Sequence, residues 1–510
     1  MKWRAFLNER FKSSGAWLDP VAGVSVFLLG VALTLPALLH HDVWHQMALA
    51  REVVATSRFP TADSFAYTPT VDPVVHHEWG AGLIVLLLAK AGGGPALALY
   101  NLCLVGAIAV LLARNLSACR VPLLVALPAA AFPIGIGVLS FPAVVAQAYS
   151  ALACALLLLF LQRDDEGSRG WIAPWLAVCA LWVNVHGGMV IGFAMLGAHA
   201  IEQAARGRRW GHLAATMAGM LAVILLNPYG LSYYGYVLNA LTMSRPVITE
   251  WNPKWLVSEF SVRQVAFLAS IWLAAVVVRR EGWRKCEGLL IVAVLAVVSV
   301  RATKALPFYA MAWLIAVPRA ISRTALGEKA RRLACEEARA LAVVLLTVAA
   351  ISCWGLVQRR FWIVRIPGVP LARTATILYP VGPVDYLQTH AFQGNMMTDF
   401  MDGSYVSWKL QARVKVGCDS RYEAAYPPEF VENVVRMYRS GDLKILKDIA
   451  LRHPTDLVLA RAKEPLSRTI EAQGEWRKVY EDDGYNLFAR PGLALPYQQR
   501  KGELIMGSIP

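Results

Sequence analysis

Charged residues are scarce in this chain. Asp, Glu, Lys and Arg supply 17% of its 510 residues, whereas hydrophobic residues supply 57% and come in long blocks. An ordinary soluble domain of this length is less apolar, so the sequence predicts a polytopic membrane protein. Lys and Arg outnumber Asp and Glu by 50 to 35, but they lie mostly in short turns between apolar blocks. That placement is the positive-inside pattern of membrane proteins, and it disfavours nucleic acid as a partner.

Cysteine spacings typical of a metal site or a disulfide framework are also absent. Of the eight cysteines, only Cys418 lies in the polar C-terminal part, so that part has no internal disulfide. The sequence shows no internal repeat, and Lys90 is one of few ionisable residues within an apolar block. Many transporters show internal repeats and several ionisable residues within their spans, so a transporter is a less favoured class.

The apolar blocks predict the transmembrane topology. The block at 21–39 follows a basic N-terminus and is long enough to cross a bilayer, so we interpret it as a retained signal-anchor. Basic turns recur after every second block, which places them on one side, the cytoplasmic side. The short block at 79–91 precedes a run of three glycines and a proline, and we interpret it as re-entrant, interfacial or half of a broken span. The prediction is about eleven spans, with the N-terminus inside.

The apolar blocks stop after residue 357. We predict a membrane domain over 1–357 and an extracytoplasmic α/β domain over 358–510, because short apolar runs there alternate with amphipathic stretches. The expected strands are 395–400, 414–418, 456–460, 477–481 and 485–489, and the expected helices include 428–439 and 443–452.

The loop between the first two apolar blocks, residues 40–79, carries an unusual set of side chains. It opens with Asp42 and His45 among other polar groups and closes with His77, Glu78 and Trp79. Ionisable groups at the membrane boundary are costly and usually functional, so we interpret this loop as the active site. Partial desolvation there is expected to raise the pKa of Asp42 toward that of a general base. The alternative is a solvated loop with incidental histidines.

Further polar motifs fall on the same predicted face. His186 precedes two glycines, which permit close approach of a backbone or ligand, although a capped helix end would look the same. Arg301 and Lys304 lie at the outer end of a span and suit a phosphate or pyrophosphate, the alternative being snorkelling toward lipid headgroups. A divalent cation is a further option, with Glu78 as one ligand, but no histidine pair has a fixed zinc spacing. The other polar motifs of this face are Ser140-Phe141-Pro142, Asn184, Asn227, Tyr229, Glu250 and Trp251.

These motifs, in this order, resemble a bacterial family of GT-C-type membrane glycosyltransferases. The likeness covers most of the chain and continues through Gly403-Ser404-Tyr405 and Asp419-Ser420-Arg421, which by themselves look like tight turns. The motifs that carry it are Asp42-x-Trp44, Asp63-Ser64-Phe65-x-Tyr67-Thr68, His77-Glu78-Trp79, Trp182-x-Asn184-x-His186-Gly187-Gly188, Asn227-Pro228-Tyr229-Gly230, Glu250-Trp251 and Arg301-x-x-Lys304.

The resemblance implies an enzyme of the bacterial cytoplasmic membrane that moves a sugar from a polyprenyl-phosphate donor to an acceptor, with inversion. Asp42 would be the general base, Glu78 and His186 further catalytic groups, and Arg301 with Lys304 the donor-phosphate site. The expected substrate cavity comprises His45, His77, Trp79, Asn184, Asn227, Tyr229, Glu250 and Trp251. Many GT-C enzymes carry two neighbouring acids after the first span, whereas Val43 and Trp44 follow Asp42 here. The alternatives are a lipid-linked ligase or other group transferase, a transporter or flippase, and an inactive assembly scaffold.

Overall fold

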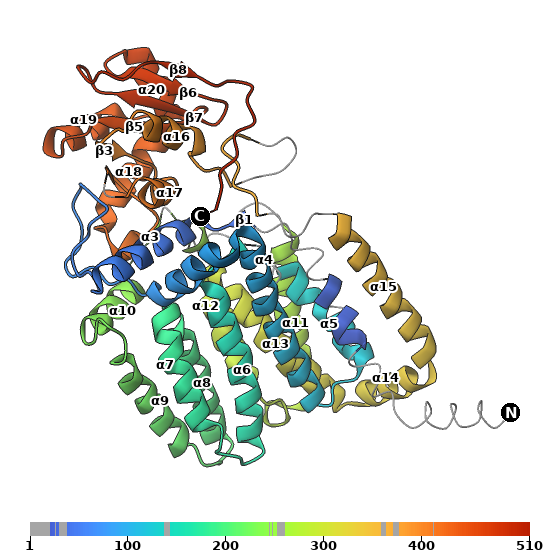
Figure 1. Cartoon of the computed structure of the whole chain (residues 1–510). Coiled ribbons are helices and arrows are strands. Elements are labelled where there is room, and N and C mark those ends of the chain that lie inside the picture. Colours follow the sequence, from blue (N-terminus) through green and yellow to red (C-terminus); the bar gives the residue numbers. More distant parts are fainter. Residues whose placement is uncertain are drawn as a thin grey trace.

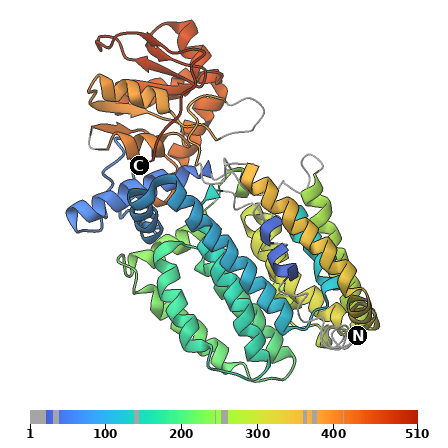
Figure 2. The same cartoon turned by 45° about the vertical axis from the view of Figure 1, so that its right-hand side comes forward.

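The computed structural model describes residues 21–25, 27–29, 38–136, 143–243, 245–246, 248–251, 261–358, 364–370, 377–411 and 413–509. Part of the expected first span and the turn at Ser140-Phe141-Pro142 lie outside these residues. A bundle of helices makes up one part of the molecule, and a smaller α/β region caps one end of it (Figure 1). Helix α3 (His41–Thr56) lies between the two parts, as the view turned by 45° also shows (Figure 2).

Four helices in the described part are long and apolar enough to cross a membrane. They are α4 (Trp79–Ala118), α11 (Val262–Glu281), α13 (Leu306–Ser322) with the short turn before it, and α15 (Ala338–Gln358). Shorter apolar helices are α5 (Leu123–Ile136), α7 (Ile172–Val185), α8 (Met189–Ala205), α9 (Gly211–Ile224) and α12 (Leu289–Arg301). The number of about eleven spans stays a prediction.

Helix α4 joins the short block at 79–91 to the block that follows it. Its backbone is non-helical at Gly93, where φ is 55° and ψ is −140°, a conformation that glycine adopts without the strain of a side chain. Of the three interpretations of the short block, half of a broken helix agrees with this geometry.

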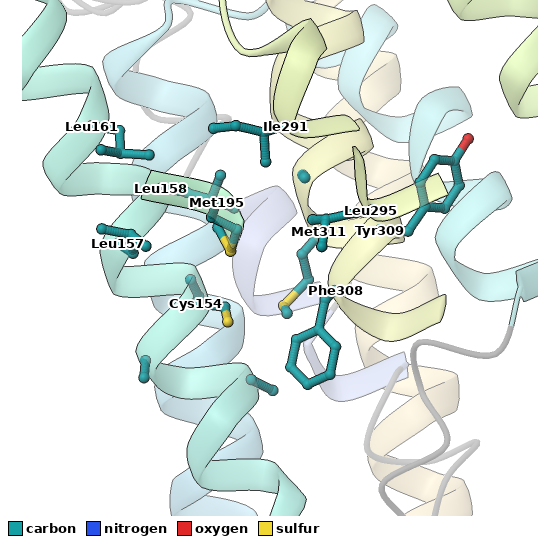
Figure 3. Close-up of a cluster of buried hydrophobic side chains, with 14 of the residues drawn as sticks. Cys154, Leu157, Leu158, Leu161, Met195, Ile291, Leu295, Phe308, Tyr309 and Met311 are labelled. Atoms are coloured by element: carbon teal, nitrogen blue, oxygen red, sulfur yellow. The ribbon is translucent and has the colours of Figure 1, made fainter. Parts of the chain in front are cut away.

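Helix α13 lies at the centre of the bundle. Of its membrane-length window 83% is buried, against 17–22% for the other three long helices. Figure 3 shows Phe308 and Met311 packed among side chains of α6 (Gln147–Asp165), α8 and α12. Burial of each such side chain stabilises the fold by roughly 1.5–3 kcal/mol. This core fixes the position of Lys304, which lies just before α13.

Basic turns gather at the end of the bundle away from the α/β region. Asp164 at the end of α6 accepts from Arg169 at 2.5 Å and from His212 at 2.8 Å, and Glu287 pairs with Arg319 at 2.7 Å and Arg323 at 2.9 Å. These contacts agree with the expectation that the basic turns share a side. An ion-pair network therefore ties these turns together. Which side faces the cytoplasm stays a prediction.

The C-terminal region contains a six-stranded sheet of order β4-β3-β5-β7-β6-β8. β3 is parallel to β4 and β5, and β7 is antiparallel to β5 and β6. The five expected strands and two expected helices all form. Their bounds are β3 (Gly394–Met397), β4 (Val414–Val416), β5 (Leu457–Arg461), β6 (Arg477–Glu481), β7 (Tyr485–Ala489), α18 (Pro428–Ser440) and α19 (Leu443–Arg452), with β8 at Gln498–Gln499.

The stretch 40–79 is not a loop throughout, which corrects the sequence-based interpretation. Its first half is helix α3, sixteen residues long, and the 227–262 stretch likewise contains helix α10 (Ser232–Thr242). Val43, Trp44 and Met47 lie at helical spacing on α3 and are buried. Their packing partners belong to the C-terminal region: Trp44 lies edge-on to Tyr379 and Tyr405, with ring centroids 5.5 and 4.9 Å away.

The second half of this stretch is docked on the C-terminal sheet. Ala66 forms a parallel bridge with Val416 of β4, and Val416 N–H donates to the carbonyl of Phe65 at 2.9 Å. Beside the bridge, Arg421 forms ion pairs with Asp63 and Asp419, and all three side chains are at most 1% exposed. The C-terminal region therefore holds the segment that connects Asp42 to Glu78.

Candidate active site

Asp42 lies in the first turn of α3, where His40 is the residue preceding the helix. The Nδ1 atom of His40 is 3.0 Å from Oδ2 of Asp42, and the Asp42 side chain is 25% exposed. Burial alone would raise the pKa of Asp42, but His40, His45 and Lys304 outweigh it and hold the pKa well below its usual range. This contradicts the expected upward shift. Asp42 is a stable carboxylate, and the imidazole beside it is the reason.

His40 shows the reverse effect. Burial lowers the pKa of this imidazole, yet the carboxylate of Asp42 outweighs burial and raises it above the usual value. The two groups therefore titrate as a pair.

Glu78 lies at the start of α4 and is surrounded by three polar side chains. Gln46 of α3 donates Nε2–H to Oε2 at 2.5 Å, and the Nε2 atoms of His77 and His186 each lie 3.5 Å from Oε1. Burial raises the pKa of Glu78, but His77 and then His186 lower it to about 2. Glu78 is therefore also an anion at neutral pH.

Two glycines allow this close arrangement at the start of α4. A Cβ at Gly82 would lie 2.3 Å from the carbonyl oxygen of Gln46, and a Cβ at Gly80 would lie 2.6 Å from that of Asn184. Any side chain at these positions would push α4 away from α3 and α7. The glycines thus set the distance between Glu78 and Gln46.

His186 caps the end of α7 with its proton on a defined nitrogen. Gly188 N–H donates to Nδ1 at 3.0 Å, and Ser150 Oγ lies 2.6 Å from the same atom. Nδ1 is therefore an acceptor, so the ring proton of the neutral imidazole is on Nε2, which faces Glu78. Burial lowers the pKa of His186 to about 4. A Cβ at Gly188 would lie 2.2 Å from Ser150 Oγ, which explains the second of the two glycines that follow this histidine.

The two expected phosphate-binding residues, Arg301 and Lys304, lie in different surroundings. Lys304 reaches the acids: it pairs with Glu250 at 3.3 Å, and it lowers the pKa of Asp42. Arg301 ends α12 with an exposed side chain and makes no ion pair with the residues that the structure describes. Trp251 is 38% exposed and lies under the guanidinium of Arg245, 4.4 Å from ring centroid to Cζ. Lys304 and Glu250 therefore join the cluster, whereas no hydrogen bond or ion pair among the described residues links Arg301 or Trp251 to it.

Four other expected cavity residues, Trp79, Asn184, Asn227 and Tyr229, form hydrogen bonds near the acids. Trp79 donates Nε1–H to Oδ1 of Asn184 at 3.0 Å, and Asn227 donates to the carbonyl of Val183 at 2.9 Å. Tyr229 donates its hydroxyl to the carbonyl of Pro60 at 3.2 Å. These residues hold α4, α7 and the non-helical part of the 40–79 stretch, here called the first outer loop, together around the acids.

The C-terminal region contributes a group that sequence reasoning treated as a turn. Ser420 Oγ lies 3.1 Å from Nδ1 of His45, and Ser404 Oγ lies 2.8 Å from Ser420 Oγ. Burial lowers the pKa of His45. The signal in the sequence was the central serine of each short motif, Ser404 and Ser420. The contact with His45 could not be recognised because His45 lies far away along the chain.

Within the described ranges, no group of three or more His, Cys, Asp or Glu side chains is arranged to hold a metal ion.

The fold and the site together describe a helical membrane protein with an acidic and imidazole-rich centre under an α/β cap. No protein-family model and no curated protein matches the chain. Among solved structures, it is similar to the apo crystal structure of the Archaeoglobus fulgidus oligosaccharyltransferase. The TM-score is 0.54 at 12% identity, over 94% of this chain and 75% of that chain. At this identity the likeness shows the fold alone.

Proposed function

We propose that this protein is a membrane glycosyltransferase that moves a sugar from a polyprenyl-phosphate donor to an acceptor hydroxyl at the outer face of a bacterial cytoplasmic membrane. The observation that carries the proposal is that one lysine, Lys304, forms an ion pair with Glu250 at 3.3 Å and interacts electrostatically with two further anionic carboxylates, Asp42 and Glu78. The oligosaccharyltransferase of similar fold supports it.

In the proposed reaction, the acceptor oxygen forms a bond to the anomeric carbon while the bond from that carbon to the phosphate oxygen breaks. The acceptor proton passes to Asp42, and polyprenyl phosphate leaves with the bonding electron pair. Lys304 balances the charge that develops on the phosphate. One in-line displacement inverts the anomeric centre.

The low pKa of Asp42 shapes this step. A carboxylate of low pKa is a weak base, so it accepts the proton only as the new bond forms. The Nδ1 atom of His40 lies 3.0 Å from Oδ2 of Asp42. His40 must be neutral for Asp42 to accept a proton readily, because a protonated imidazole holds the carboxylate in an ion pair. In this proposal, Glu78 and the Nε2–H of His186 orient the acceptor.

The experiment supplies the purified protein in lipid nanodiscs with a panel of radiolabelled polyprenyl-phosphate sugars and measures release of polyprenyl phosphate. Cleavage of one donor supports the proposal. The same lipids in proteoliposomes test the transporter alternative, since movement of intact donor between leaflets without cleavage would contradict a transferase.

A further inference from the structure

A cavity of about 280 Å³ opens next to the candidate site, where three parts of the chain meet. The first outer loop contributes Asp72 and Val75, α10 contributes Ser232, Tyr236 and Asn239, and the C-terminal region contributes the buried Ala424. Val75 is 3% exposed and Ala424 5% exposed, so these two buried residues form a well-packed floor of the cavity. Asp72, Ser232 and Asn239 are exposed and lie at the rim.

The lining determines which ligand chemistry fits. It presents a hydroxyl, an amide, a carboxylate and a phenol ring, and among the residues that the structure describes, none that lines it is Lys or Arg. A phosphate would find no cation among these residues. Hydrogen-bonding groups beside one aromatic ring suit a neutral ligand with several hydroxyl groups, and the volume lies at the small end of ligand sites, enough for one sugar ring.

The wall of the cavity touches the candidate catalytic groups. The rings of Tyr236 and His77 stack with centroids 4.8 Å apart and 21° between planes, and the Tyr236 hydroxyl lies 3.3 Å from Nε2 of His77. The same nitrogen lies 3.5 Å from Oε1 of Glu78. Lys304 and Glu250, which form the proposed donor-phosphate side, are not among the residues that line the cavity.

We propose that this cavity is the acceptor subsite and that it binds a neutral saccharide, with one hydroxyl directed past His77 toward Glu78. The assignment of the ligand as the acceptor rests on the proposed function. The assignment of the ligand as a saccharide rests on the lining residues alone. The aromatic wall and polar rim hold the ring, and the Glu78 side of the cavity receives the reacting hydroxyl.

Gly235 offers a way to close the cavity without breaking the fold. It lines the cavity from the middle of α10, and a Cβ there would meet no atom within 4 Å. The variant Gly235→Phe therefore fills the space instead of displacing backbone. Gly355→Phe is the matched control, because Gly355 lies in α15, also has nothing within 4 Å, and is remote from the cavity.

The test measures binding of methyl glycosides of common hexoses and pentoses by saturation-transfer NMR, with the full chain in nanodiscs. We expect a signal for at least one glycoside with the unchanged protein and with Gly355→Phe, and affinity at least tenfold weaker with Gly235→Phe. An equal signal with Gly235→Phe, or no signal from any glycoside, would overturn the cavity assignment. A third result would also overturn it: a short hydroxyl-bearing peptide that displaces the glycoside, binds more tightly than the glycoside, and no longer binds to Gly235→Phe.

Failure of the proposed function would look different. Asp42→Asn is expected to retain glycoside binding while it loses donor cleavage. Glycoside binding by a protein that cleaves no donor would contradict the transferase and still support a saccharide site.

Discussion

The buried ion pairs of Arg421 yield the sharpest prediction of stability. Arg421 donates two hydrogen bonds to Asp419, at 2.9 and 2.8 Å, and its third nitrogen pairs with Asp63 of the first outer loop. All three side chains are at most 1% exposed. The variant Arg421→Met would leave two carboxylates buried without their cation, and removal of one partner from such a group costs about 3–5 kcal/mol.

A matched control lies in the same region. Arg490 pairs with Asp456 at 2.8 Å, but the two side chains are 50% and 21% exposed, so Arg490→Met is expected to cost at most about 1 kcal/mol. Thermal unfolding in detergent compares the two variants. We expect Arg421→Met to lower the Tm far more than Arg490→Met.

A second assay shows where the loss occurs. Phe65 is 6% exposed because the loop is docked on β4, so chymotrypsin should cleave there slowly in the unchanged protein. Arg421→Met should expose this bond and accelerate cleavage several-fold. Equal Tm values for the two variants, together with unchanged cleavage at Phe65, would refute the docking of the loop on the C-terminal region.

Three further predictions concern the site. Burial lowers the pKa of His76 from 6.5 to about 3, so its contribution to stability is complete above pH 6.5 and falls by roughly 2 kcal/mol at pH 5; His76→Gln should narrow the difference between Tm values at pH 8 and pH 5, and an unchanged difference would contradict the shift. Gly82→Ala should displace Gln46 and reduce donor cleavage at least tenfold, since its Cβ would lie 2.3 Å from the Gln46 carbonyl, whereas Gly355→Ala should have no effect. Lys304→Gln should raise the KM for the lipid-phosphate donor about tenfold or more, and an unchanged KM would remove Lys304 from the donor site.

Local patterns made the C-terminal elements predictable. The strand at 477–481 and the helix at 443–452 form with the bounds expected from their alternating and helical hydrophobic spacing. Helix α3 was missed because its apolar face packs on Tyr379 and Tyr405, which lie far along the chain, so the stretch looked like a polar loop.

The candidate site shows the same division. Single residues such as Asp42 and Glu78 were recognisable from residue type and position, because acids beside clustered imidazoles are unusual at a membrane boundary. Their electrostatics were not. The direction of the Asp42 pKa shift depends first on the imidazole of His40, 3.0 Å away, and then on His45 and Lys304. The His45 contact depends on Ser420, hundreds of residues away in sequence. Only the folded chain defines these distances.

The central claim is that a carboxylate of the first outer loop takes the acceptor proton. The most direct measurement compares donor-dependent glycosyl transfer by Asp42→Asn with transfer by Glu52→Gln. The control makes the same chemical change on the same helix, at a residue whose carboxylate accepts a hydrogen bond from the exposed Ser64. We expect Asp42→Asn to lower kcat by about 100-fold or more, while Glu52→Gln stays within about twofold. Full transfer activity in Asp42→Asn would contradict the claim.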